Sequence, residues 1–198
     1  MPEARFDPSK AVTFDLASGL VHIEGAPSRV LVPAEALRTL CAAAGREASG
    51  AFGRSIGAPM GLRVAHRFAE EGASDVEGVR RASVEAIVDH LGGEMAIAGF
   101  GSLSIERWGH ALVLVVDNSP LGGPGDVVVE AVLEGALEAA TGRPARALVI
   151  ARDTTRARFL IAGSAAVAKA KAWLEQGVSW GEALTRLHAQ DAVARGDA

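Results

Sequence analysis

Apolar residues recur with helical spacing between positions 126 and 140. The recurrence at i, i+3, i+4, i+7, i+8 and i+11 falls on Val129, Val132, Leu133, Ala136, Leu137 and Ala140. One apolar stripe of this kind predicts an amphipathic helix that begins near Asp126. The opposite face carries Glu130, Glu134 and Glu138 at four-residue spacing. Gly142 and Pro144 predict the end of the helix, through a left-handed cap and a ring that cannot continue it.

Shorter runs of apolar residues predict strands. The first predicted hairpin joins 12–16 to 20–23 through Ser18-Gly19, and 29–32 is a candidate third strand. Two further strands are expected over 95–105 and 110–116. A second hairpin is expected to join 146–151 to 156–162. Because 111–116 is apolar on both faces, we expect it at the centre of a sheet.

Helices are predicted over 33–57, 60–71, 74–91, 164–176 and 179–192. Pro59 is expected to separate the first two of these helices, and Gly92-Gly93 to end the third. Small residues follow one another every four positions, at Gly45, Ser49, Gly53 and Gly57 of the first helix and at Gly61 beyond it. Each interior glycine costs about 1 kcal/mol relative to alanine. The series therefore predicts a face where another backbone comes close, from this chain or from a second subunit.

Composition indicates one well-buried domain. Of the 198 residues, 49% are hydrophobic and 22% are charged, which excludes global disorder. The net charge of −4 argues against binding to nucleic acid or to an anionic membrane. No apolar run approaches the roughly 20 residues of a membrane-spanning helix. Cys41 has no partner for an intramolecular disulfide and no signal segment is evident, so we expect a cytoplasmic location.

Arginines concentrate at the predicted second hairpin. They are Arg143, Arg146, Arg152, Arg156 and Arg158. One interpretation is an exposed sheet edge that charge protects against association. The other is a docking patch, with Arg152, Arg156 and Arg158 on the hairpin itself, for an acidic partner or a carboxylate ligand.

No set of catalytic groups converges in the sequence. Residues 53–57 match the G-x-S-x-G pattern, but that motif needs a strand before its serine, and these residues lie in a predicted helix. Cys41 stands among alanines, where a cysteine is typically an inert small hydrophobe. We therefore expect neither an enzyme nor a bound cofactor.

Three segments in order resemble a known family. They are the glycine-punctuated helix with Gly45, Gly53 and Gly57, the strands within 99–121, and the helix and strand within 128–151. Together they resemble the 4-vinyl-reductase-like domain, a family of hydrocarbon-binding modules. That family is related in fold to the TRAPP vesicle-tethering core subunits and to aromatic-effector sensor domains of some bacterial transcription activators.

The resemblance implies an α/β (α+β) fold with a twisted antiparallel sheet packed against helices. It also implies a dimer with a hydrophobic pocket between sheet and helices. The chain would then divide into an arm and β-hairpin (1–32), a ligand-binding domain (33–163) and a helical extension (164–198). Many family members carry metal-binding cysteines in the hairpin corresponding to 146–162, which contains none here. We therefore expect no metal.

The first hypothesis is a non-catalytic homodimer that holds a hydrophobic or aromatic small molecule or a lipid chain. The candidate pocket walls are Phe52, Ile56, Phe100, Leu103 and Trp108, each of which could equally be packed core. The alternative is a TRAPP-like adaptor that assembles protein partners without a small ligand. In both, Gly45, Ser49, Gly53 and Gly57 form a dimer or packing face.

Overall fold

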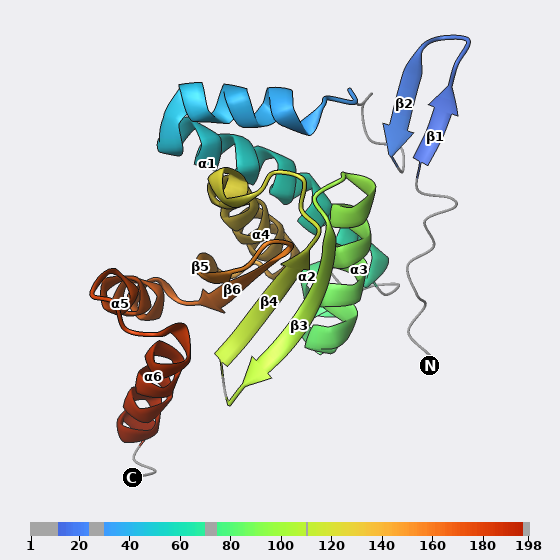
Figure 1. Ribbon diagram of the computed structural model, residues 1–198. Coiled ribbons are helices and arrows are strands. Elements are labelled where there is room, and N and C mark those ends of the chain that lie inside the picture. The colour runs from blue at the N-terminus through green and yellow to red at the C-terminus, as the bar shows by residue number, and fades with distance from the viewer. Residues whose placement is uncertain (1–11, 24–29, 70–74, 110, 196–198) are drawn as a thin grey trace.

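A four-stranded antiparallel sheet lies at the centre of the molecule (Figure 1). In the computed structural model, which describes residues 12–23, 30–69, 75–109 and 111–195, the strand order is β3-β4-β6-β5. The strands are β3 (Ser102–Trp108), β4 (Ala111–Asp117), β5 (Arg146–Arg152) and β6 (Arg156–Ala162). The central place predicted for 111–116 is confirmed, since β4 pairs with β3 and β6. His110 lies outside the described residues.

Helices cover both faces of this sheet. They are α1 (Ala34–Arg67), α2 (Asp75–Arg81), α3 (Val84–Ile97), α4 (Asp126–Thr141), α5 (Ser164–Glu175) and α6 (Trp180–Arg195), with a 3-10 turn, η2 (Gly123–Gly125), before α4. Alternate residues of β4 point to opposite faces. Leu114 and Val116 join the apolar core beneath α1, α3 and α4. Val113 and Val115 pack with residues of α5 and α6. The fold is α+β with the sheet between two helical layers (Figure 1), which confirms the predicted class.

The predicted helix over 126–140 is confirmed as α4, and Gly142 caps its end in the left-handed conformation at φ 65°. Strands β5 and β6 confirm the second hairpin. A register shift between Val149 and Ala151 places one extra residue in β5. The extra residue bends the strand locally.

Helix α1 differs from its prediction at two places. Gly45 has a positive φ that favours glycine (φ 81°, ψ 175°), so the helical path breaks there. Gly45 thus leaves the regular four-residue series of small residues. The helix then continues through Pro59, where a break was expected. Gly57 and Gly61 lie against α4 on either side of the proline, and this packing outweighs its local cost.

The small-residue face of α1 meets α4 of the same chain. A Cβ atom added at Gly53, Gly57 or Gly61 would lie 2.5, 2.1 and 2.1 Å from the carbonyl oxygens of Val128, Val132 and Ala136. The two backbones are therefore too close for any side chain at these positions.

Helix α3 replaces part of a predicted strand. The predicted helix over 74–91 is interrupted after α2, and Ser83 caps α3 by accepting from the Ala86 amide at 3.1 Å. Ser74 lies outside the described residues. Helix α3 runs through Gly92-Gly93 to Ile97, so the strand predicted from Met95 begins only at Ser102. Met95 is fully buried on the inner face of α3, which explains why the helix continues.

The N-terminal hairpin is confirmed as β1 (Val12–Asp15) and β2 (Leu20–Ile23), and it stands apart from the four-stranded sheet (Figure 1). The described part of the candidate strand over 29–32 is irregular, and it exposes Val30, Leu31 and Val32. Arg29 lies outside the described residues. None of the described helices is both long and apolar enough to cross a membrane.

Candidate functional site

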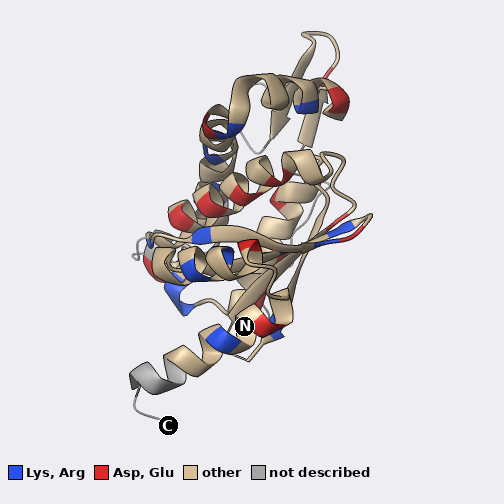
Figure 2. Cartoon of the chain, turned by 60° about the vertical axis from the view of Figure 1, so that its left-hand side comes forward, with Lys and Arg blue, Asp and Glu red and all other residues tan. Residues whose placement is uncertain are grey.

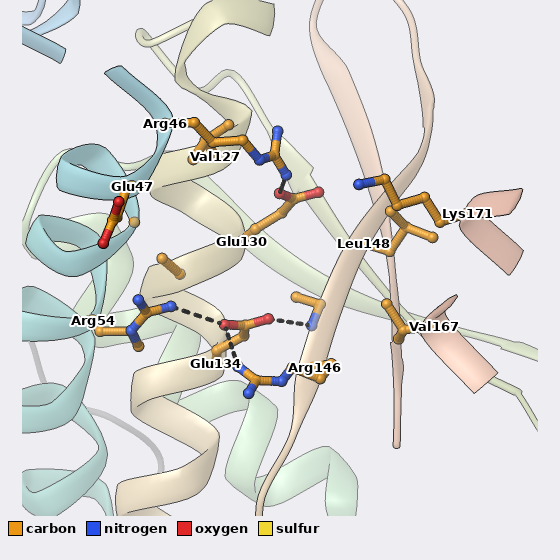
Figure 3. Close-up of a pocket in the computed structure, with 13 residues that line it drawn as sticks. Arg46, Glu47, Arg54, Val127, Glu130, Glu134, Arg146, Leu148, Val167 and Lys171 are labelled. Atoms are coloured by element: carbon orange, nitrogen blue, oxygen red, sulfur yellow. Dashed lines mark hydrogen bonds and ion pairs between the residues drawn. The ribbon is translucent and has the colours of Figure 1, made fainter. Parts of the chain in front are cut away.

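A groove of about 520 Å³ opens between α1, α4, β5 and α5 (Figure 3). It is lined by Arg46, Glu47, Gly50, Arg54, Val127, Glu130, Ala131, Glu134, Arg146, Ala147, Leu148, Val167 and Lys171. Its volume falls within the range of small-molecule sites. The groove combines a charged set of side chains with small and apolar ones, so we treat it as the candidate functional site.

Two glutamates of α4 join the helix to the open edge of the sheet. Glu130 Oε1 accepts from the Val149 amide at 2.7 Å, and Glu134 Oε1 accepts from the Ala147 amide at 3.2 Å. Strand β5 is an edge strand, so these amides have no neighbouring strand to bond to. Acidic residues recur on successive turns of α4 (Figure 2). The hydrogen bonds of Glu130 and Glu134 turn this face toward β5. Their four-residue spacing is the sequence signal for the arrangement, but the sequence did not identify β5 as their partner.

Burial raises the pKa of Glu130, because its charged form loses contact with water. The Val149 hydrogen bond and the charge of Arg46 act in the opposite direction, while Asp126 and Glu134 add to the increase. Only 9% of the Glu130 side chain is exposed. The Glu130 carboxyl group is therefore a buried part of the groove wall.

Arginines meet these glutamates through single contacts (Figure 3). Arg46 Nη2 lies 3.3 Å from Glu130 Oε2. Arg54 Nη1 and Arg146 Nη1 both approach Glu134 Oε2, at 3.4 and 3.2 Å. One carboxylate oxygen thus serves two guanidinium groups, from α1 and from β5.

The three arginines predicted to form the docking patch are ion-paired within the chain. Arg152 pairs with Asp126, at the start of α4. Arg156 donates to both oxygens of Asp117, at 2.8 and 3.2 Å. Arg158 likewise donates to Glu106, at 3.0 and 3.2 Å, and lowers the pKa of that carboxyl group. Each of the three charges therefore has a carboxylate partner in the same molecule.

The five candidate pocket residues lie in different surroundings, and none lines the groove. Phe100 is buried in the apolar core, with Ile56 and Leu103 packed against the same cluster. Phe52 and Trp108 are 39% and 45% exposed. The Trp108 ring meets the Trp180 ring edge to face, at 4.8 Å between centroids.

The four residues of the candidate dimer or packing face are also divided. Gly53 and Gly57 are covered by α4, as described above. The Ser49 hydroxyl donates to the Cys41 carbonyl at 3.0 Å, across the break at Gly45. Within the described chain, no three His, Cys, Asp or Glu residues are grouped so that they could hold a metal ion.

Comparison with known proteins supports the fold. No family model matches the chain, and neither does any curated protein. Among solved structures, a similar fold is found in the phenol-responsive sensory domain of the transcription activator PoxR, crystallised with phenol. The TM-score is 0.54 at 16% identity, and the match covers 90% of this chain and 92% of that one. The resemblance drawn from the sequence to sensor domains of transcription activators is thus supported at the level of the fold.

Proposed function

We propose that this chain is a non-catalytic regulatory module that binds a small molecule in the groove between α1, α4, β5 and α5. The observation that carries the proposal is the groove itself, where four elements bring charged and apolar groups around one space of ligand size. The fold shared with the PoxR sensory domain supports a sensory role. The lone cysteine is compatible with a cytoplasmic module.

An apolar part of the ligand would contact Val127, Leu148 and Val167 in the groove. The expectation of a hydrophobic or aromatic ligand is kept. The proposed binding site is the groove and no longer the five pocket residues predicted from the sequence. Entry into the core cluster around Phe100 would require packed side chains to separate, whereas the groove is already open.

The groove glutamates favour binding over catalysis. Glu130 and Glu134 each hold a backbone amide of β5 and an arginine. A carboxylate engaged in this way is a poor general base, since proton uptake would weaken the contacts that tie α4 to the sheet.

A second candidate function is a homodimeric or TRAPP-like adaptor. It is favoured by the exposed apolar side chains near the N-terminus. Phe14, Leu16, Val30, Leu31 and Leu40 are between 58% and 89% exposed. They lie on or near the hairpin and the first turns of α1. Apolar side chains gathered in one region of a surface are typical of an interface. In this candidate the region binds a second copy or another protein, and the groove stays empty.

Native mass spectrometry of the purified chain, compared with its denatured mass, separates the two candidates. The regulatory module predicts co-purified small-molecule mass that is lost in Gly50→Leu, which fills the groove. Gly181→Leu is the matched control, because an added Cβ there meets nothing within 4 Å. An empty dimer would favour the adaptor, and equal bound mass in all three proteins would place the ligand elsewhere.

A further inference from the structure

We propose that the groove recognises an oxyanion, a carboxylate or a phosphate, which binds between Arg54 and Arg146 with Arg46 and Lys171 beside it. This inference rests on the proposed function, because it specifies the chemistry of the small molecule that the groove takes. The sequence hypothesis drew a carboxylate ligand or acidic partner from the hairpin arginines, with Arg152, Arg156 and Arg158 as the contacts. The present inference keeps only Arg146 from that cluster and pairs it with Arg54 of α1.

The first observation is the convergence of Arg54 and Arg146. They reach the same oxygen of Glu134 from α1 and from β5, and each uses one guanidinium nitrogen in that contact. The other oxygen of Glu134 accepts from the Ala147 amide. A single carboxylate thus faces two arginines and a backbone amide. A guanidinium group carries five N–H donors, so both arginines keep donors for a second oxyanion.

The arginines outside the groove show the contrast. Arg156 and Arg158 each meet a carboxylate of their own with two nitrogens, at 2.8 to 3.2 Å. Each of these guanidinium groups is already engaged bidentately by a carboxylate. The groove contacts are single and longer, at 3.2 to 3.4 Å. Arg54 and Arg146 are about half exposed, so their planar groups are open to a ligand that could bind them bidentately.

The second observation is the local charge. Arg46, Arg54, Arg146 and Lys171 outnumber Glu47, Glu130 and Glu134 by one positive charge, whereas the whole chain has a net charge of −4. The groove is therefore a positive site in an acidic protein, which favours an anion there over the rest of the surface.

The third observation is the space beside the arginines. Gly50 lies one helical turn from both Arg46 and Arg54. A Cβ atom at Gly50 would lie 3.8 and 3.9 Å from Arg54 Nη2 and Nη1. Apart from its chain neighbours and the nearby backbone of its own helix, it would meet no other heavy atom within 4 Å. The Arg54 guanidinium thus extends past a position without a side chain. Ala131 and Ala147 continue this small-residue lining toward β5. A larger side chain at Gly50 would occupy the place where we put the oxyanion.

The test uses the full chain and two anionic probes, inorganic phosphate and succinate. Each is titrated at constant ionic strength with chloride as the balancing anion, and binding is followed by isothermal calorimetry and by the thermal midpoint. We expect saturable binding of at least one probe. Preference for phosphate would assign a phosphate ester, and preference for succinate would assign a carboxylate. Arg54→Gln/Arg146→Gln is expected to weaken binding at least tenfold.

The matched control is Arg107→Gln/Arg186→Gln, which also removes two positive charges. Both arginines are exposed and ion-paired, at Glu85 and Glu182, away from the groove lining. This variant should bind the probe as the wild type does. Gly50→Leu keeps every groove charge and should also lose binding. It serves as the second variant if the groove double variant does not fold.

Equal weakening in the two double variants would show a general charge effect and overturn the inference. Absence of saturable binding of both probes to the wild type would also overturn it. Phenol is the uncharged probe in the same titration. If phenol binds to the wild type but not to Gly50→Leu while both anions fail, the oxyanion inference is wrong and the proposed function stands. If nothing binds and native spectra show no extra mass, the proposed function fails as well.

Discussion

The Glu130 carboxylate of α4 accepts a hydrogen bond from the Val149 backbone amide of β5, with 2.7 Å between Oε1 and nitrogen. Helix α4 is thereby tied to the open edge of the sheet by a side chain instead of a neighbouring strand. Glu134 repeats the contact one turn later, at Ala147. The two contacts protect an edge that could otherwise pair with another chain, and they fix the carboxylates around which the groove arginines gather.

Glu130 should make stability depend on pH in an unusual direction for a carboxyl group. Burial raises its pKa in the folded state above the ordinary value of 4.5. The folded chain therefore binds more protons than the unfolded chain between 4.5 and the raised pKa, and this contribution to stability decreases as pH increases through that window. Glu130→Gln, which keeps an oxygen acceptor for Val149, should gain stability relative to the wild type as pH rises from about 4 to 7.

Urea unfolding of both proteins across this pH range measures the difference. Glu138→Gln, at an exposed position of the same helix, is the control for replacing a glutamate by glutamine. A stability difference between wild type and Glu130→Gln that is constant with pH would contradict the assignment of the raised pKa to Glu130.

Local patterns in the sequence were sufficient for elements whose signals are local. Helix α4 has its apolar stripe and its glycine cap, and β5 and β6 have their turn, so both units were predicted closely. Pro59 and Gly92 were misread as breaks, because the contacts that carry α1 and α3 through them come from α4 and β3, more than ten residues away. Local propensity is weaker than such tertiary packing.

The groove could be predicted less well than the fold. Its lining comes from four elements between positions 46 and 171, and no short motif spans them. The regular spacing of Glu130 and Glu134 was visible, but their partners depend on which strand becomes the sheet edge. Arg146 was singled out because it lies in the arginine cluster of the hairpin, whereas its convergence with Arg54 of α1 exists only in three dimensions.

Two alanine substitutions on α1 should act in opposite directions. At Gly57 an added Cβ would lie 2.1 Å from the Val132 carbonyl oxygen, so the helices must separate. We expect Gly57→Ala to lower the free energy of unfolding by about 1 to 3 kcal/mol. At Gly50 the added Cβ has room, and Gly50→Ala should stabilise α1 by up to about 1 kcal/mol. Chemical denaturation of the two variants measures both effects. Similar behaviour of the pair would mean that α1 and α4 are not in close backbone contact.

Glu94 should be among the most sensitive polar positions. Its side chain is 1% exposed and is paired with both Arg63 and Arg67 of α1. Glu94→Ala leaves two partly buried arginines without this carboxylate, and the expected loss is about 3 to 5 kcal/mol. Glu85→Ala is the control, because Glu85 pairs with Arg107 at an exposed site and should contribute little. Thermal unfolding compares the two, and equal effects would argue against the buried cluster as a link between α1 and α3.

The edge-to-face contact of Trp108 and Trp180 joins the end of β3 to the start of α6, with the ring centroids 4.8 Å apart. Arg158 lies over the Trp180 ring at 5.6 Å, so Trp180 contacts both a ring and a cation. A double-mutant cycle with Trp108→Ala and Trp180→Ala isolates the ring pair, and we expect a coupling of about 0.5 to 1.5 kcal/mol. Trp180→Ala should also speed hydrogen exchange in α6 more than in α4, because α6 loses a contact that holds it to the sheet. Additive effects of the two substitutions, with unchanged exchange in α6, would mean that this contact does not hold the C-terminal helix in place.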